Sequence, residues 1–541
     1  MPSSDSEPGG VDTAPAPPTA PAPDAEPGQT DSGATAEPLA DDTVDEPAPA
    51  GSDLSTSGTT SSLPLATTAA WHLARRAAHA PTAEIAARIA AMGTHAWIDR
   101  QLEPEGIGDS RLEDYVSRYF PWSRLPAAQL ENATGGRPFL AEYQVRIALL
   151  ARARFTERVL LETVVETLSD HIYVPLAGKG APFSPDWDQT LRRHALGPFN
   201  ELLHAALRHP AVLRSFDNQH STKDSPNENL GRELLELMTV GSGHYTEEDV
   251  RQSALLLTGH TIDWDTLEYA FVPERHHVGA LQIMGFAHPN ASAEAGPTVL
   301  AEYVDHLAHH EATALRLARR FAVRYISDAP SAAVVEDLAA AYLDGDTSIA
   351  SLVRATLTHE EFRTSAGRKW KRPLEYVMTI ARAARPAEFV PDGRVGANRE
   401  FDTGAYGWLV GLGQHLPRGW PGVDGYPDTA PYWRSPNRTL AMWNGTVHAV
   451  KGDASESGVT DWAQVLEIGL GDNVLRTAER ITQHLTGFTW PRAHLEDVAA
   501  MLGNGGERAV GPSDVITEHS VTWHIKDALQ LVFASPYGFL R

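Results

Sequence analysis

The sequence predicts a mainly α protein: one large multi-helical domain with a minor β-hairpin and a disordered N-terminal tail. Two observations lead to this fold class. From Ala69 onward, apolar residues recur at helical spacing in Ala- and Leu-rich segments that Gly and Pro interrupt. Before that point the composition changes abruptly, and it does so only once in 541 residues. We therefore expect a tail over residues 1–66 and a single helical domain over 67–541.

The tail consists almost entirely of Ala, Pro, Ser, Thr, Gly, Asp and Glu. It holds twelve acidic residues in its first 60 positions, and no Lys or Arg precedes Arg75. Such a segment cannot bury enough apolar surface to offset the entropy lost on ordering, so we expect disorder. The formal net charge of -25 leaves the remaining chain acidic as well, which argues against general nucleic-acid binding.

Composition also limits the compartment and the chemistry. No run of about 18 apolar residues occurs, so the sequence predicts no membrane span. The N-terminus lacks the charged and apolar regions of a signal peptide, so the chain as it stands is expected to be cytoplasmic. A start site placed too far downstream would instead hide an export signal. The absence of Cys excludes disulfides, thiolate catalysis and Cys-based zinc sites.

Helical periodicity defines the elements of the domain in chain order, and capping residues, Gly and Pro mark their ends. The expected helices cover about 69–79, 82–101, 109–119, 138–152, 155–171, 187–207, 226–240, 247–258, 296–309, 312–326, 331–343, 347–357, 372–384, 434–449, 473–486, 490–502 and 519–534.

Two regions depart from this pattern. Apolar residues nearly alternate after Ile262, and LQIMGF follows RHHVGA, so residues 262–286 are expected to form one hairpin with His276 and His277 near its turn. Residues 387–434 are rich in Gly, Pro and aromatics and are expected to form a long ordered loop. Its aromatic rings either provide a sugar-binding platform or clamp the loop onto the helices. They are Trp420, Tyr426, Tyr432 and Trp433.

The densest cluster of polar residues lies in SPNENLGRELLELMTVGSGHYTEEDVRQSALLLTGHTID, from Ser225 to Asp263. Ser225 is expected to cap a helix that begins with Pro226, and Glu228 completes the capping pattern. Thr246 and Asp249 repeat the pattern at a second helix.

The first of these helices has an apolar face and a solvated row of charges, Glu228, Arg232 and Glu236, spaced for ion pairs. Asn229 and Glu233 lie on the border of the apolar face, where a carboxylate would be partly buried and would need a partner. Glu233 is therefore the first candidate for chemistry.

Imidazole and carboxylate groups suit a divalent metal ion that activates water. The candidate metal ligands are His171, Glu233, His276 and His277, with His171 and Glu233 as candidate catalytic residues. The alternative is that His171 and Glu233 form a buried hydrogen bond or ion pair, while the histidine pair caps a turn. Further polar candidates for this site are Asp170, Asn227, Glu228 and Asn229.

Two other polar segments allow both a functional and a structural interpretation. Asp217 and Asn218, in DNQHSTKD, could line a polar pocket, although turns favour the same residue types. The basic run RKWKR, from Arg368 to Arg372, could hold an anionic ligand at a helix N-terminus, or it could be a solvated helix entry neutralised by acidic helices. The sequence contains no GxSxG serine elbow and no Gly-rich phosphate loop.

Several spaced segments together resemble the bacterial family called domain of unknown function 1800 (DUF1800). They are WHLARRAAHAPTAEI, AWIDRQLEPEGI, RRHALGPF, PNENLGRELLELMTVG, YTEEDVRQSALLLTGHTID, RHHVGALQIMGF, KWKRPLEYV, VDGYPDTAPYWRSPN and ASPYGF. The resemblance covers about residues 69–541. It implies a mostly helical bacterial protein, often exported and often encoded beside a sulfatase-like family, DUF1501. It implies no known reaction.

This chain departs from the family pattern at two blocks. The family often has Trp-His-Asn-His-Phe where this chain has LSDHIYV, so His171 persists and Asp170 precedes it. Met238 stands where the family usually has His.

Two functions from different classes follow. The first is a noncatalytic binding or assembly protein that acts with a DUF1501-type partner, and the second is a metal-dependent hydrolase with a His/Glu site. The sequence leaves open whether the protein is an enzyme.

Overall fold

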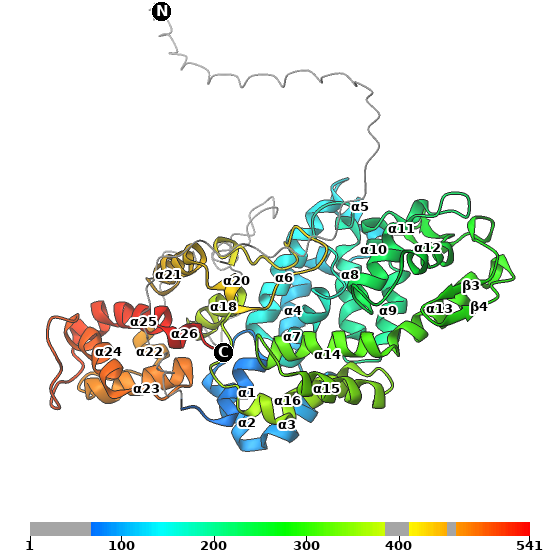
Figure 1. Cartoon of the computed structure of the whole chain (residues 1–541). Coiled ribbons are helices and arrows are strands. Elements are labelled where there is room, and N and C mark those ends of the chain that lie inside the picture. The colour runs from blue at the N-terminus through cyan, green and yellow to red at the C-terminus, as the bar shows by residue number, and fades with distance from the viewer. Residues whose placement is uncertain (1–65, 385–409, 452–460) are drawn as a thin grey trace, which may run out of the picture. The chain divides into compact units, whose positions relative to one another are not determined.

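The computed structural model describes residues 66–384, 410–451 and 461–541. The predicted tail therefore lies outside the described residues, apart from Ala66, and so does most of the first half of the predicted loop at 387–434. One compact unit extends from Ser62 to Arg541. Its described residues are mainly helical, as the sequence predicts, and the few strands form two small hairpins (Figure 1).

The helices follow the apolar periodicity in chain order. Those before the hairpins are α1 (Ala69–Ala77), α2 (Ala83–Met92), α3 (Thr94–Leu102), α4 (Ser110–Tyr119), α5 (Ala127–Ala133), α6 (Ala141–Phe155), α7 (Val159–Ser169), α8 (Ser184–His194), α9 (Phe199–Leu207), α10 (Pro210–Ser215), α11 (Glu228–Glu233) and α12 (Glu247–Leu256). Those after the hairpins are α13 (Gly296–Ala308), α14 (Glu311–Tyr325), α15 (Ala332–Asp344), α16 (Ile349–Thr358), α17 (Glu360–Arg363), α18 (Pro373–Ala384), α20 (Ala430–Trp433), α21 (Pro436–Lys451), α22 (Trp462–Val465), α23 (Val474–Thr486), α24 (Arg492–Asn504), α25 (Ile525–Ala534) and α26 (Pro536–Phe539).

Two large apolar cores hold these helices. One core joins α1–α3 with α7–α16, and the other joins α18 with α21–α26, which Figure 1 colours from yellow-green to red. A small third cluster lies between α4 and α6. Burying apolar side chains in cores of this size is the main favourable contribution to folding.

Four predicted helices differ in detail from the observed ones, and one of them, expected at 519–534, is π-helical at Ser520–His524 before α25 begins. The segment expected at 82–101 is two helices, because Gly93 has a φ of 86° that breaks the first. The segment expected at 187–207 is also divided, since Pro198 precedes α9 and cannot continue a helix. The last, expected at 226–240, is α11 followed by a π-helical segment at Leu234–Met238. The periodic pattern also failed to predict the short helices α5, α10, α17, α20, α22 and α26.

The prediction of one hairpin over residues 262–286 is wrong, because this region contains two separate hairpins. Strands β1 (His260–Asp263) and β2 (Glu268–Phe271) form one antiparallel pair, and β3 (Leu281–Ile283) and β4 (Phe286–His288) form another. Met284 and Gly285 both have positive φ, which suits the two-residue turn that closes the second pair. His276 and His277 therefore lie between the hairpins and not at a hairpin turn.

None of the helices in the described ranges combines the length and apolar character that crossing a membrane requires.

Candidate functional site

A cavity of about 540 Å³ lies among the end of α7, helix α14 and the segment Trp420–Tyr432. Five arginines face it, so it is called the arginine-lined cavity below. The basic lining residues are Arg316, Arg319, Arg320, Arg324 and Arg372. Carboxylates and aromatic rings complete the wall: Asp170, Asp424, Asp428, Trp420, Tyr426 and Tyr432. Its volume falls within the range of about 300–1,000 Å³ that is typical of small-molecule sites.

Helix α14 supplies four of these arginines, and three of them recur every four residues on one face. They differ in what they bind. Arg316 donates from Nε to the carbonyl oxygen of Leu237 at 3.2 Å, and Arg324 is buried among carboxylates. Arg320 makes no hydrogen bond or ion pair within the described residues. The cavity therefore contains a cation that is available to a ligand.

A buried ion network forms the floor of the arginine-lined cavity. Arg324 contacts Glu375 at 2.5 Å and Glu166 at 3.2 Å, while Arg372 pairs with Glu166 and lies 3.5 Å from Glu375. Arg541 pairs with Glu375 as well. Although burial opposes ionisation of Glu375, the guanidinium groups of Arg541, Arg324 and Arg372 hold its pKa well below its usual range. The network therefore stays charged at neutral pH.

The same network includes the basic run that the sequence analysis interpreted in two ways. Lys369, Lys371 and Arg372 are all buried, so the run is neither a solvated helix entry nor a free anion site. Lys369 donates from Nζ to Asp328 Oδ1 at 2.5 Å and to the carbonyl oxygen of Asp428 at 2.5 Å. Carboxylates neutralise two residues of the run, Lys369 through Asp328 and Arg372 through Glu166, while Lys371 donates to the carbonyl oxygen of Gly538.

Asp170 follows α7 directly and reaches both the network and the cavity. Its carboxylate accepts the N–H of Tyr426 at 3.3 Å and lies 3.5 Å from Nη1 of Arg372. Burial raises the pKa of Asp170 to about 6, against the lowering effect of Arg372. Asp170 is therefore a cavity-lining acid that changes charge near neutral pH.

His171, the neighbour of Asp170, is buried and also lines the cavity. Its Nε2 lies 2.9 Å from the carbonyl oxygen of Met238, so this nitrogen donates and Nδ1 is left as an acceptor with no partner. Burial and the nearby Arg320 and Arg316 lower the pKa of His171 well below its usual range. The imidazole is therefore neutral, with a free acceptor atom.

The end of the π-helical segment supports two cavity residues. Its last carbonyls, of Leu237 and Met238, accept hydrogen bonds from Arg316 and His171. π-Helical turns leave the regular hydrogen-bonding pattern and frequently occur at functional sites. The motif from Ser225 to Asp263 thus helps to position two side chains of the arginine-lined cavity through its backbone carbonyls.

The four aromatic residues of the predicted loop differ in burial. Tyr426 and Trp433 are buried, and Trp433 donates its indole N–H to the carbonyl oxygen of Pro427 at 2.7 Å. Trp420 and Tyr432 are only partly buried, line the cavity and have ring centroids 5.6 Å apart. Asp424 accepts the indole N–H of Trp420 at 2.7 Å and orients that ring.

The structure does not bring the predicted metal ligands together. Within the described ranges, no group of three or more His, Asp and Glu side chains is placed to hold a metal ion. His171 lies at the cavity, whereas His276 has Nδ1 2.8 Å from the carbonyl oxygen of Thr258 and Nε2 3.2 Å from Asn290. His277, partly buried, donates its backbone N–H to the Thr258 hydroxyl. The histidine pair thus holds the turn after α12.

Glu233 is half-buried at the end of α11 and is not among the residues that line the cavity. It makes no hydrogen bond or ion pair within the described part of the chain. Burial and the neighbouring Glu236 raise its pKa. The alternative of a bond between His171 and Glu233 is therefore not observed. Their catalytic roles stay a prediction that these contacts do not support.

The remaining polar candidates mainly bind backbone. Asn218 donates to the carbonyls of Leu257 and His260, Asn227 to that of Asp217, and Asn229 to that of Phe216. Asp217 pairs with the exposed Lys179, and Glu228 lies 3.6 Å from Arg232. These contacts hold the entry to α11 in place, because buried backbone groups need partners.

The capping pattern is confirmed at one helix and wrong at the other. Thr246 and Asp249 form a reciprocal capping box on α12. Helix α11 begins at Glu228 with Asn227 as its cap, not with Ser225, because the Asn227 side chain accepts the N–H of Asn229 at 2.9 Å.

The fold and the cavity define a class: a mainly helical protein with a preformed, arginine-lined pocket supported by a buried ion network. The chain belongs to the family described as Protein of unknown function (DUF1800), whose model matches residues 72–539. Searches of curated proteins and of solved structures found no match.

Proposed function

We propose that this protein is a binding protein for a small anionic ligand, which it holds in the arginine-lined cavity. The observation that carries the proposal is Arg320, a cavity-lining guanidinium with no partner in the described chain. A guanidinium forms two parallel hydrogen bonds with a carboxylate or a sulfate group, and such charge-assisted bonds are among the strongest in proteins.

The net charge of the cavity wall favours an anionic ligand. Arg324 and Arg372 are compensated by Glu166, Glu375 and Asp428 in the network below. The three other arginines of the wall all belong to α14, and they face its two remaining carboxylates, Asp170 and Asp424. These arginines are Arg316, Arg319 and Arg320. The uncompensated charge of the wall is therefore positive, although the whole chain is acidic.

Replacing Arg320 with Gln is expected to weaken the binding of sulfate and acetate by about 10- to 100-fold, because a hydrogen bond to a charged group contributes about 1.5–3 kcal/mol. Isothermal titration calorimetry on the full chain measures the change. Arg476→Gln is the matched control, since Arg476 is exposed on α23 and outside the cavity. Equal affinities in the wild type and Arg320→Gln, or no binding of either anion, would count against the proposal.

Anion affinity is expected to fall as pH rises through about 6, the pKa of Asp170. Protonated Asp170 is neutral at lower pH, whereas the ionised carboxylate repels an anion at higher pH, so we expect an affinity difference of about tenfold between pH 5 and pH 8. The Asp170→Asn variant has a neutral side chain at every pH. It should therefore bind at pH 5 and at pH 8 with the affinity that the wild type has at pH 5.

The groups around Asp170 keep their charge across this pH window. Arg372 and Arg320 stay charged, and the pKa of Glu166 is held well below its usual range by Arg372 and His79 despite burial. His171 and His415 stay neutral because burial lowers their pKa values, that of His415 to about 3. If the Asp170→Asn variant keeps the full pH dependence of anion affinity, a group other than Asp170 causes that dependence.

Association with a DUF1501-type partner, and export, remain proposals that the family resemblance alone supports. Co-purification of the two proteins from cells that express both would test the association. We do not propose the metal-dependent hydrolase, because the described residues contain no candidate ligand set.

A further inference from the structure

We infer that the ligand of the arginine-lined cavity is an acidic sugar, a pyranose ring that carries one anionic substituent. This inference rests on the proposed function and adds the ligand class. Three features of the cavity carry it: its charge, its two partly exposed aromatic rings and its hydrogen-bond acceptors.

The charge of the wall fits a single negative group. Three arginines of α14 face Asp170 and Asp424 after the compensated pairs are set aside. A ligand with one negative charge neutralises the excess, whereas a polyphosphate would bring several charges against the two carboxylates. Arg320 is the only one of these arginines that is both partly buried and unpaired in the described chain, so the anionic substituent is placed beside it.

The aromatic rings and the volume require more than an inorganic ion. Trp420 and Tyr432 are only partly buried and line the cavity. Arg438 lies over the Tyr432 ring, 4.0 Å from its centroid, and Asp424 fixes the orientation of the Trp420 indole. A sugar ring places its axial C–H groups against such a face, which buries apolar surface without desolvating its hydroxyls. A cavity of about 540 Å³ leaves room for that ring beside the anionic group.

Two residues that line the cavity add hydrogen-bond acceptors. Asp424 is exposed and uses only one of its lone pairs, on the indole of Trp420, while Nδ1 of His171 is buried and has no partner. Sugar hydroxyls are donors that match these acceptors, and a buried acceptor without a donor is costly. A planar aromatic acid such as benzoate offers no such donors. The combination of cation, ring face and acceptors therefore selects an acidic sugar.

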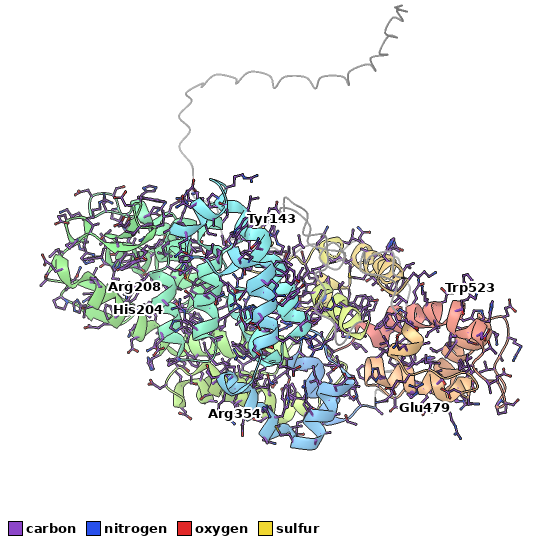
Figure 2. The ribbon with its side chains drawn as sticks, turned by 180° about the vertical axis from the view of Figure 1, so that it is seen from behind. Tyr143, His204, Arg208, Arg354, Glu479 and Trp523 are labelled. Atoms are coloured by element: carbon purple, nitrogen blue, oxygen red, sulfur yellow. The ribbon has the colours of Figure 1, made fainter. Side chains whose placement is uncertain are left out.

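Calorimetric titration of the full chain with glucuronate, glucose, acetate, benzoate and adenosine monophosphate tests the inference. Glucuronate is expected to bind at least about tenfold more tightly than each of the other four. Trp420→Ala should weaken glucuronate binding on the order of tenfold and leave acetate binding unchanged. Trp523→Ala is the matched control, because Trp523 is 65% exposed and lies far from the cavity, on the segment before α25 (Figure 2).

The outcomes separate this inference from the proposed function. Equal binding of glucuronate and acetate, or tighter binding of benzoate or adenosine monophosphate, overturns the acidic sugar and leaves an anion site. Equal binding of glucose and glucuronate also overturns it, because the charge would then contribute nothing. Failure of sulfate, acetate and glucuronate alike to bind overturns both. An unchanged glucuronate affinity in Trp420→Ala contradicts the stacking arrangement on which the inference depends.

Discussion

Replacing Glu375 with Gln is expected to lower the free energy of unfolding by about 3–5 kcal/mol, because removing one partner from a buried ion pair leaves an uncompensated charge. Glu375 is buried on α18, and its carboxylate meets Arg324, Arg372 and Arg541. These three guanidinium groups come from distant parts of the chain. The amide of Gln occupies the same space but carries no charge, so the effect reports the electrostatic contribution and not a cavity. Urea unfolding followed by circular dichroism measures it.

Glu479→Gln is the control for this experiment. Glu479 is exposed on α23, and Figure 2 shows it at the surface. An exposed substitution of this kind is expected to change the free energy of unfolding by less than about 0.5 kcal/mol. A Glu375→Gln protein as stable as the Glu479→Gln protein would show that the network contributes little to stability.

Replacing Gly425 with Ala is expected to cost about 2–5 kcal/mol of stability and to abolish anion binding. Gly425 has a φ of 73°, which a residue with Cβ adopts at a cost of about 1–2 kcal/mol. The added Cβ would also lie 2.2 Å from the carbonyl oxygen of Asp170, and such overpacking costs about 1–3 kcal/mol more. Relief of this overlap must move the Trp420–Tyr432 segment away from α7, which disrupts the cavity wall.

Gly471→Ala separates the two contributions. Gly471 has a φ of 85°, and a Cβ there would meet no atom within 4 Å. Its substitution should therefore show only the backbone cost of about 1–2 kcal/mol and leave anion affinity unchanged. If Gly425→Ala behaves like Gly471→Ala in both unfolding and calorimetry, the segment does not depend on its close approach to Asp170.

The helices could be predicted because their signals are local. Apolar residues repeat every three or four positions along the helices, and capping side chains satisfy free backbone groups at the start of several of them, such as α1, α2 and α12. The boundaries failed where backbone geometry overrode the periodic pattern, as at Gly93 and Pro198. The two hairpins were merged into one because short apolar runs carry too few residues to define their pairing.

The candidate site was predicted in part. The sequence pattern indicated Asp170 and His171, which do line the cavity, but it grouped them with Glu233 and the histidine pair. It missed the arginines of α14. Their four-residue spacing in ALRLARRFAVRY was visible, yet arginine at this spacing is equally typical of an exposed helix face.

The sequence by itself determined the helical class, the position of most helices and the family to which the chain belongs, since these depend on residues close together in the chain or on motifs read in order. Only the tertiary structure decided which charges are buried and which remain free. Arg372 and Glu166 are 206 residues apart, and Arg541 and Glu375 are 166 apart, so no local pattern reveals that they pair. The same pairing leaves Arg320 without a partner in the described residues, and the proposed anion site depends on this difference between the compensated arginines and Arg320.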